Sequence, residues 1–245
     1  MKRRTAMLSA VWAAWAASSA SAQMPKLDDV MKGLGKLPAT GGGGATDDAT
    51  AAAGIKEALA VGTERAVQSL SRTDGYFADA AVKILMPSSL QKVADLARKV
   101  GYQPQVDAFI LSMNRAAEAA APLASRHFGD AIRAMTFDDV RRILGGGDTA
   151  ATDYFRGKTQ DKLYAAFKPI VSQKVDEVGA TRAYKEMVGR YESVPFMKSP
   201  SLDLDDYVTR KSLDGLFLRV GEEEKKIRTN PAARTTDLLK SVFGR

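Results

Sequence analysis

Three polar residues stand together in a run of otherwise small apolar ones. Asn114, Arg115 and Glu118 lie within residues 113–121, where the other positions are Met113 and alanines. On a helix, Asn114 and Glu118 are one turn apart on one face and Arg115 lies three positions before Glu118, so the three side chains can meet. An amide, a guanidinium and a carboxylate in this spacing could orient a ligand or form a carboxylate- and arginine-based catalytic site. These three are the candidate ligand-binding residues.

The same spacing also has an architectural interpretation. A helix that is apolar nearly all round is usually central in its domain, and its polar side chains must then find partners. Buried, paired polar groups usually hold elements together. At Asn114, Arg115 and Glu118 we therefore favour a structural network, or a surface ion pair, over a ligand pocket.

No other set of residues points to catalysis or to a metal. His127 is the only histidine and cysteine is absent, whereas zinc sites are built mainly from these two residue types. A Ser-His-Asp triad would have to use His127, whose neighbours fit a helix and not a sharp turn, so we favour a structural or surface role for it. No spacing among the 29 acidic residues singles out a pair for a two-carboxylate mechanism. We predict no catalytic residue, no metal and no cofactor.

A partial phosphate-loop signature occurs at Gly157-Lys158-Thr159. A Walker A loop requires a glycine five residues before Gly157, where this chain has Thr152, and a strand before the loop. The preceding residues instead indicate the end of a helix, with Gly157 as its C-cap. The signature therefore does not predict nucleotide binding.

Apolar residues recur at helical spacing through most of the chain, and no alternating run is long enough to predict a strand. The fold class is all-α, with about nine helices in a single multi-helix domain. Tyr76 to Met86 is one of its apolar segments and ends before Pro87. Thr136 begins a capping box, and Asn230-Pro231 is a helix start signal. Helices are expected near residues 55–70, 90–100, 104–120, 137–144, 159–171, 180–191, 204–227 and from 231 onward.

The N-terminus has the pattern of a secretory signal peptide. Three basic residues at positions 2–4 precede an apolar run over residues 6–17, and Ala20-Ser21-Ala22 offers small residues for cleavage after Ala22. The run is shorter than the roughly 20 residues that span a bilayer, so we predict no transmembrane segment. Four glycines at 41–44 indicate a flexible linker. The expected division is signal peptide 1–22, N-terminal segment and Gly-rich linker 23–50, and helical domain 51–245.

Cysteine usage and charge limit the destination and the partners. Without cysteine the chain has neither a disulfide framework nor a lipid-modified residue at the cleavage site, so the expected location is periplasmic or secreted and not that of a lipoprotein. Removal of the signal peptide with its three basic residues lowers the net charge from +7 to +4. Acidic and basic residues are interspersed, which does not fit a nucleic-acid-binding face.

Eight short segments between about Gly54 and the C-terminus form a recognisable set. They are Asp74–Phe77, Met113–Glu118, Met135–Asp139, Lys168–Val171, Tyr207–Thr209, Asp214–Phe217, Glu224–Arg228 and Asn230–Asp237. Together they resemble an exported bacterial family known only as a domain of unknown function, number four-one-nine-seven. The resemblance implies an all-helical exported protein, with no activity, cofactor or site residue.

Two functions from different classes follow as hypotheses. The favoured one is a non-enzymatic binding or interaction module for an envelope protein or an apolar ligand, since the sequence lacks a recognisable catalytic set. The alternative is an enzyme with a carboxylate/Arg site around Asn114, Arg115 and Glu118. A third and weaker option is association with anionic lipid through the residual positive charge.

Overall fold

The computed structural model describes residues 43–177, 180–192, 202–237 and 240, and all regular secondary structure within them is helical. The prediction of an all-α domain is confirmed. The predicted signal peptide, 1–22, lies outside the described residues. The first described helix, α2, begins at Gly43, so residues 43–50 of the predicted linker belong to this helix. Alanines that follow the two glycines favour the helix over this stretch.

The helices from α3 to α8 follow one another with short connections, and longer segments follow α2 and α8. Short 3-10 turns η1 (Ser88–Leu90), η2 (Ala121–Leu123) and η3 (Pro231–Ala233) precede or follow the longer helices. The α-helices are α2 (Gly43–Ser71), α3 (Gln91–Lys99), α4 (Gln103–Ala120), α5 (Ala124–Arg133), α6 (Phe137–Leu144), α7 (Ala150–Glu177), α8 (Ala180–Glu192) and α9 (Leu204–Thr229).

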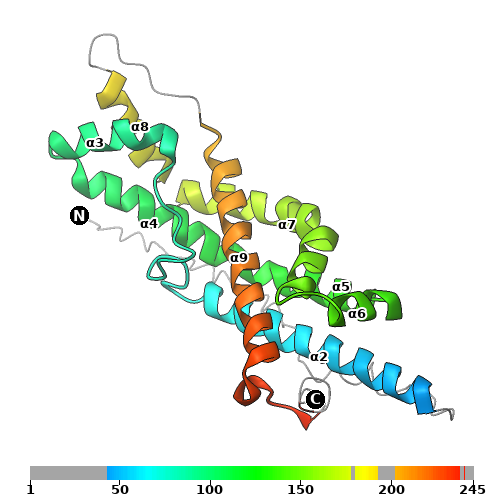
Figure 1. Ribbon diagram of the computed structural model, residues 1–245. Helices are drawn as coiled ribbons and strands as arrows, with labels where there is room; N and C mark the ends of the chain where they lie inside the picture. Colours follow the sequence, from blue (N-terminus) through cyan, green and yellow to red (C-terminus); the bar gives the residue numbers. More distant parts are fainter. Residues whose placement is uncertain (1–42, 178–179, 193–201, 238–239, 241–245) are drawn as a thin grey trace, which may run out of the picture.

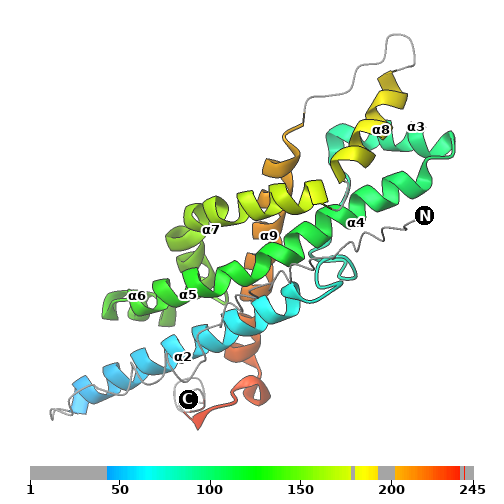
Figure 2. The same ribbon diagram turned by 180° about the vertical axis from the view of Figure 1, so that it is seen from behind.

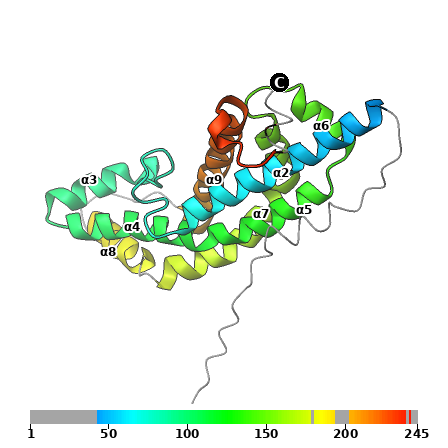
Figure 3. The same ribbon diagram turned by 90° about the horizontal axis from the view of Figure 1, so that it is seen from below.

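The molecule is elongated, and one helix crosses the others (Figure 1). α4 and α5 follow a common line that is interrupted only by η2, which contains Pro122, and α2 lies beside them (Figure 2). α9 crosses α2 and packs along α7 in the antiparallel sense. α3 and α8 lie at one end of the molecule and α6 at the other (Figure 3).

Aromatic rings join three helices at the centre of the core. The Phe128 ring of α5 lies 5.4 Å from Phe155 of α7 and 6.1 Å from Phe217 of α9, measured between centroids. All three side chains are buried, and such ring pairs contribute roughly 0.5–1.5 kcal/mol beyond the burial of their area. Ala116, Ala117 and Ala120 of α4 are buried as well, which lets the neighbouring helices approach closely.

Helix starts follow the predicted capping signals in part. Thr136 and Asp139 form the predicted capping box at the start of α6, and Asp203 caps α9 by accepting from the backbone N–H of Asp206 at 2.9 Å. Asn230 accepts from the N–H of Ala232 at 3.0 Å, but it opens the 3-10 turn η3 where an α-helix was expected. Residues 238–239 and 241–245 of that expected helix lie outside the described part of the chain.

The prediction that Tyr76–Met86 belongs to a helical pattern is wrong. Residues 72–87, which we call the strap, form turns and an extended run between α2 and η1. Asp74 has a φ of 65°, in the left-handed region, which ends the helical path. A Cβ on Gly75 would lie 2.5 Å from the backbone oxygen of Ser69, so only glycine fits this turn.

Candidate functional site

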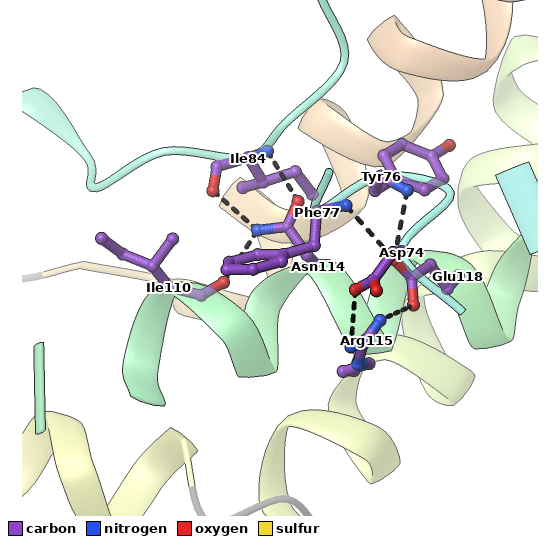
Figure 4. Close-up of polar contacts among 8 residues, drawn as sticks. All are labelled: Asp74, Tyr76, Phe77, Ile84, Ile110, Asn114, Arg115 and Glu118. Carbon is purple, nitrogen blue, oxygen red and sulfur yellow. Dashed lines mark hydrogen bonds and ion pairs between the residues drawn. The ribbon is translucent and has the colours of Figure 1, made fainter. Parts of the chain in front are cut away.

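Asn114, Arg115 and Glu118 lie side by side on α4 and are directed at the strap (Figure 4). Asn114 and Glu118 are buried, whereas the Arg115 side chain is 30% exposed. The structure therefore brings all three candidate residues together, as their spacing predicted. Asn114 and Glu118 bind backbone groups that lie 30 to 42 positions earlier in the chain, whereas Arg115 binds the carboxylates of Glu118 and Asp74.

Asn114 binds both polar groups of one strap residue. Its Oδ1 accepts from the N–H of Ile84 at 2.9 Å, and its Nδ2 donates to the carbonyl oxygen of Ile84 at 2.9 Å and to that of Ile110 at 2.8 Å. The Asn114 amide thus makes the two hydrogen bonds that a neighbouring β-strand would make to Ile84, because the strap has no such neighbour. Both N–H donors of Asn114 and its acceptor are used within the fold.

Glu118 binds the strap at its turn. Its Oε1 accepts from the N–H groups of Tyr76 and Phe77 at 3.1 and 3.2 Å, and its Oε2 accepts from Arg115 Nη1 at 2.7 Å. Arg115 Nη2 donates to Asp74 Oδ1, also at 2.7 Å. The hydrogen bond to Glu118 is the main cause that raises the pKa of Arg115 above its ordinary value. We call Asp74, Arg115 and Glu118, with the two N–H groups, the strap clamp.

Further contacts carry the strap across to α9. The Tyr76 hydroxyl donates to the carbonyl oxygen of Ser212 at 2.7 Å, and burial, followed by the charge of Glu118, raises the pKa of Tyr76. A Cβ on Gly215 would lie 2.8 Å from the Tyr76 ring, so this glycine makes room for the ring. Asp79 forms an ion pair with Arg219. The strap is therefore fixed to α4 and α9 together.

A second buried glutamate, which sequence reasoning missed, binds in the same way at α7. Glu224 accepts from the N–H groups of Ala151 and Thr152 at 3.0 and 2.9 Å and from the Thr152 hydroxyl at 2.8 Å. Arg228 binds the carboxylate at 2.9 Å and donates to the carbonyl oxygen of Ile143, which ends α6. A carboxylate is favourable at this helix N-terminus. No chemical motif in the sequence marked Glu224, because it stands in a run of charged residues, Glu222 to Lys226, that is typical of an exposed surface.

An open groove between α7 and α9 was not predicted either. Its three hollows have volumes of about 480, 460 and 250 Å³. They are lined by Thr149, by residues from Thr152 to Tyr164 on α7 and by residues from Arg210 to Lys225 on α9. Arg156 borders all three. α7 continues through Gly157, so the predicted C-cap there is wrong; a Cβ on this glycine would meet nothing within 4 Å.

The remaining candidates have no assembled chemistry around them. His127 is partly exposed on α5. Thr159 of the partial phosphate-loop signature is buried inside α7, where its hydroxyl donates to the Phe155 carbonyl oxygen at 2.7 Å. Among the described residues, no three His, Cys, Asp or Glu side chains are placed to hold a metal ion. Within the same residues, no helix combines the length and the apolar character needed to cross a membrane.

Comparison with known proteins yields one match. No curated protein and no solved structure shows significant similarity to the chain. A family model described as "Protein of unknown function (DUF4197)" matches residues 45–244, which include Glu118, Glu224, the strap and the groove. The chain belongs to this family.

Proposed function

We propose that the protein is an exported, non-enzymatic module that binds a helical segment of an envelope protein in the groove between α7 and α9. The observation that carries the proposal is the groove itself. From Thr152 to Tyr164 it follows α7 over about 18 Å of helix. That length and the antiparallel alignment of the two helices suit a third helix laid between them.

The groove has the mixed lining of a protein-binding surface. Leu218 is 44% exposed beside it, and the Phe217 ring forms part of its floor. Around these apolar groups, charges of both signs come from α7 and α9. An apolar centre with a polar rim is the usual composition of an interface between proteins.

A small apolar ligand has less support than a protein partner. The cavity between α2, α6 and α9 that is lined by Ile55, Leu59, Ile143 and Ile227 has a volume of about 20 Å³. Pockets that enclose small molecules usually have a volume of at least about 300 Å³. A cavity of the observed size fits about one water molecule.

The alternative, an enzyme with its site at Asn114, Arg115 and Glu118, also has less support. The side-chain amide of Asn114 binds backbone groups of the fold. The two oxygens of Glu118 bind backbone N–H groups and Arg115. A substrate would have to displace the strap to reach them. Ligand binding by these three residues stays a prediction, and we assign them the fixing of the strap.

Site-specific photocrosslinking in the native envelope tests the proposal. A photoreactive residue in place of the exposed Gln160, inside the groove, should give one discrete adduct whose cross-link maps to a helical segment of a partner. The same residue in place of the exposed Lys92 on α3 should not. Gly157 faces open space in the groove. The side chain introduced by Gly157→Phe should therefore fill the groove and abolish the adduct. Equal adducts from both positions, or an adduct that survives the filled groove, would contradict the proposal. Sequencing of the purified protein tests export separately, with Gln23 expected at its N-terminus.

A further inference from the structure

Arg156 occupies the middle of the groove, where the three hollows meet. Its guanidinium carbon lies 4.6 Å from the centroid of the Phe217 ring, which is buried beneath it. Its side chain is 43% exposed, and its Nη1 is 3.7 Å from the nearest oxygen of Asp214. The ring thus supports the guanidinium from one side while the other side faces the groove.

The hydrogen-bond donors of Arg156 are unused in the described part of the chain. No hydrogen bond among these residues involves its guanidinium, and the 3.7 Å separation from Asp214 is too long for one. A guanidinium has five N–H donors in a planar fork, which matches the two oxygens of a carboxylate. A supported fork that points into a groove with its donors free is suited to bind such a group.

Two acidic residues stand on either side of Arg156 along α7. Asp153 lies three positions before it and Asp161 five positions after it, and both are exposed and line the hollows. Neither carboxylate has an ion-pair partner among the described residues. Eight residues of helix separate the two acids by about 12 Å. The charged residues that α7 contributes to this hollow therefore follow the order acidic, basic, acidic along the helix.

We infer that the groove recognises one carboxylate flanked by two cationic side chains, presented on one face of the partner helix. A helix aligned with α7 places such groups with Lys or Arg at i−4, Glu or Asp at i, and Lys or Arg at i+4, because eight residues span the same length on both helices. Arg156 binds the central carboxylate, and Asp153 and Asp161 pair with the two cations. The inference rests on the proposed function and specifies the chemistry of its partner.

The same charges disfavour a polyanion such as a phosphorylated segment. Asp153, Asp161, Asp214 and Glu222 all lie within the groove, and like charges brought together at an interface are costly. A single negative charge with a positive neighbour on each side avoids this repulsion. For binding in the groove, the order of the charges on the partner helix therefore matters more than the partner's net charge.

Fluorescence anisotropy with two designed peptides tests the inference on the mature protein. Both are conformationally stapled helices of the length of the groove; one presents Lys, Glu and Lys at i−4, i and i+4, and the other presents Glu, Lys and Glu. The first should bind more tightly than the second by about tenfold or more, the equivalent of one desolvated charge pair. Arg156→Glu should reduce this preference, because the central Glu of the first peptide then meets a like charge while its two lysines still pair with Asp153 and Asp161. Arg126→Glu, at an exposed position on α5, should leave it unchanged.

The outcomes separate this inference from the proposed function. If Gly157→Phe abolishes peptide binding while Arg156→Glu leaves the preference unchanged, the groove is the binding face and the assignment of Arg156 is wrong. If both peptides bind equally to the native protein, the inferred order of charges is wrong. If neither peptide binds while the photocrosslink to a partner forms and Gly157→Phe abolishes it, the proposed function stands and this inference fails. Circular dichroism of each variant confirms that its helices are intact.

Discussion

The strap clamp and the groove each place an arginine beside an acidic residue and an aromatic ring, yet the two arginines are used differently. Arg115 bonds to Glu118 and Asp74 at 2.7 Å each, and its guanidinium carbon is 6.0 Å from the Phe77 ring. Arg156 lies 4.6 Å from the Phe217 ring and 3.7 Å from its acid. The guanidinium donors of Arg115 are therefore used within the fold, whereas those of Arg156 are available to bind another molecule.

The difference shows that residue type and local exposure do not distinguish a binding group from a structural one. The two arginine side chains are similarly exposed, at 30% and 43%. What separates them is the partner available within the fold. Arg115 sits next to a buried carboxylate that needs a counter-charge, and Arg156 faces an open groove between two long helices.

Loss of the buried carboxylate should have the largest effect on the clamp. Glu118→Ala removes the acceptor for two backbone N–H groups and for Arg115, and should lower the free energy of unfolding by about 3 kcal/mol. Urea denaturation measures this loss. Asp161→Asn, at an exposed acid of the groove, is the matched control and should change stability by less than about 0.5 kcal/mol. Similar small losses for both variants would remove the distinction between the two regions.

Substitutions at two glycines test how tightly side chains pack beside the strap and in the groove. Gly215→Ala places a methyl group 2.8 Å from the Tyr76 ring and should destabilise the protein by about 1–3 kcal/mol, the usual cost of overpacking. Gly157→Ala faces open space in the groove and should stabilise it by about 0.5–1 kcal/mol, because alanine restricts the unfolded chain. Thermal unfolding of both variants measures whether each substitution lowers or raises the stability of the protein. A gain at Gly215 would show that the ring is not tightly seated.

Acid should weaken the fold through two carboxylates in the first turns of helices, Asp139 in α6 and Asp206 in α9. The backbone N–H of Thr136, and then its hydroxyl, hold the pKa of Asp139 below its usual range; Arg210, and then Tyr164, do so for Asp206. A lowered folded-state pKa gives stability that is complete above the unfolded value of about 3.9 and is lost as the pH falls through the lowered value. Asp139→Asn should cost about 1 kcal/mol at neutral pH, as for a lost helix cap. The variant should also lose less stability than the native chain between pH 5 and pH 2, roughly the range in which such groups titrate. An identical pH dependence would contradict this role.

The sequence predicted much of the fold because its signals were local. The one-turn spacing of Asn114 and Glu118 placed them on one buried face, and the capping box at Thr136 placed the start of α6. The targets of Asn114 and Glu118 were out of reach, because the strap has no periodic pattern and pairs with residues 30 to 42 positions away.

Two further misses arose where packing overrides local preference. A glycine usually favours the end of a helix, but buried Phe155, Thr159 and Leu163 hold α7 together on both sides of Gly157. Glu224 is buried although its neighbours are charged, because the start of α7 supplies the N–H groups that it binds. The groove depends on both features. It forms only because α7 continues through Gly157 and because Glu224 holds α9 in line with α7.

Parallel urea denaturation of Arg115→Gln and Arg156→Gln tests the contrast between the two arginines most directly. Arg115→Gln leaves Glu118 buried without its counter-charge and should lower the free energy of unfolding by about 2 kcal/mol. Arg156→Gln should change it by less than about 0.5 kcal/mol, because no hydrogen bond within the described residues is lost. Equal losses from the two substitutions would contradict the account.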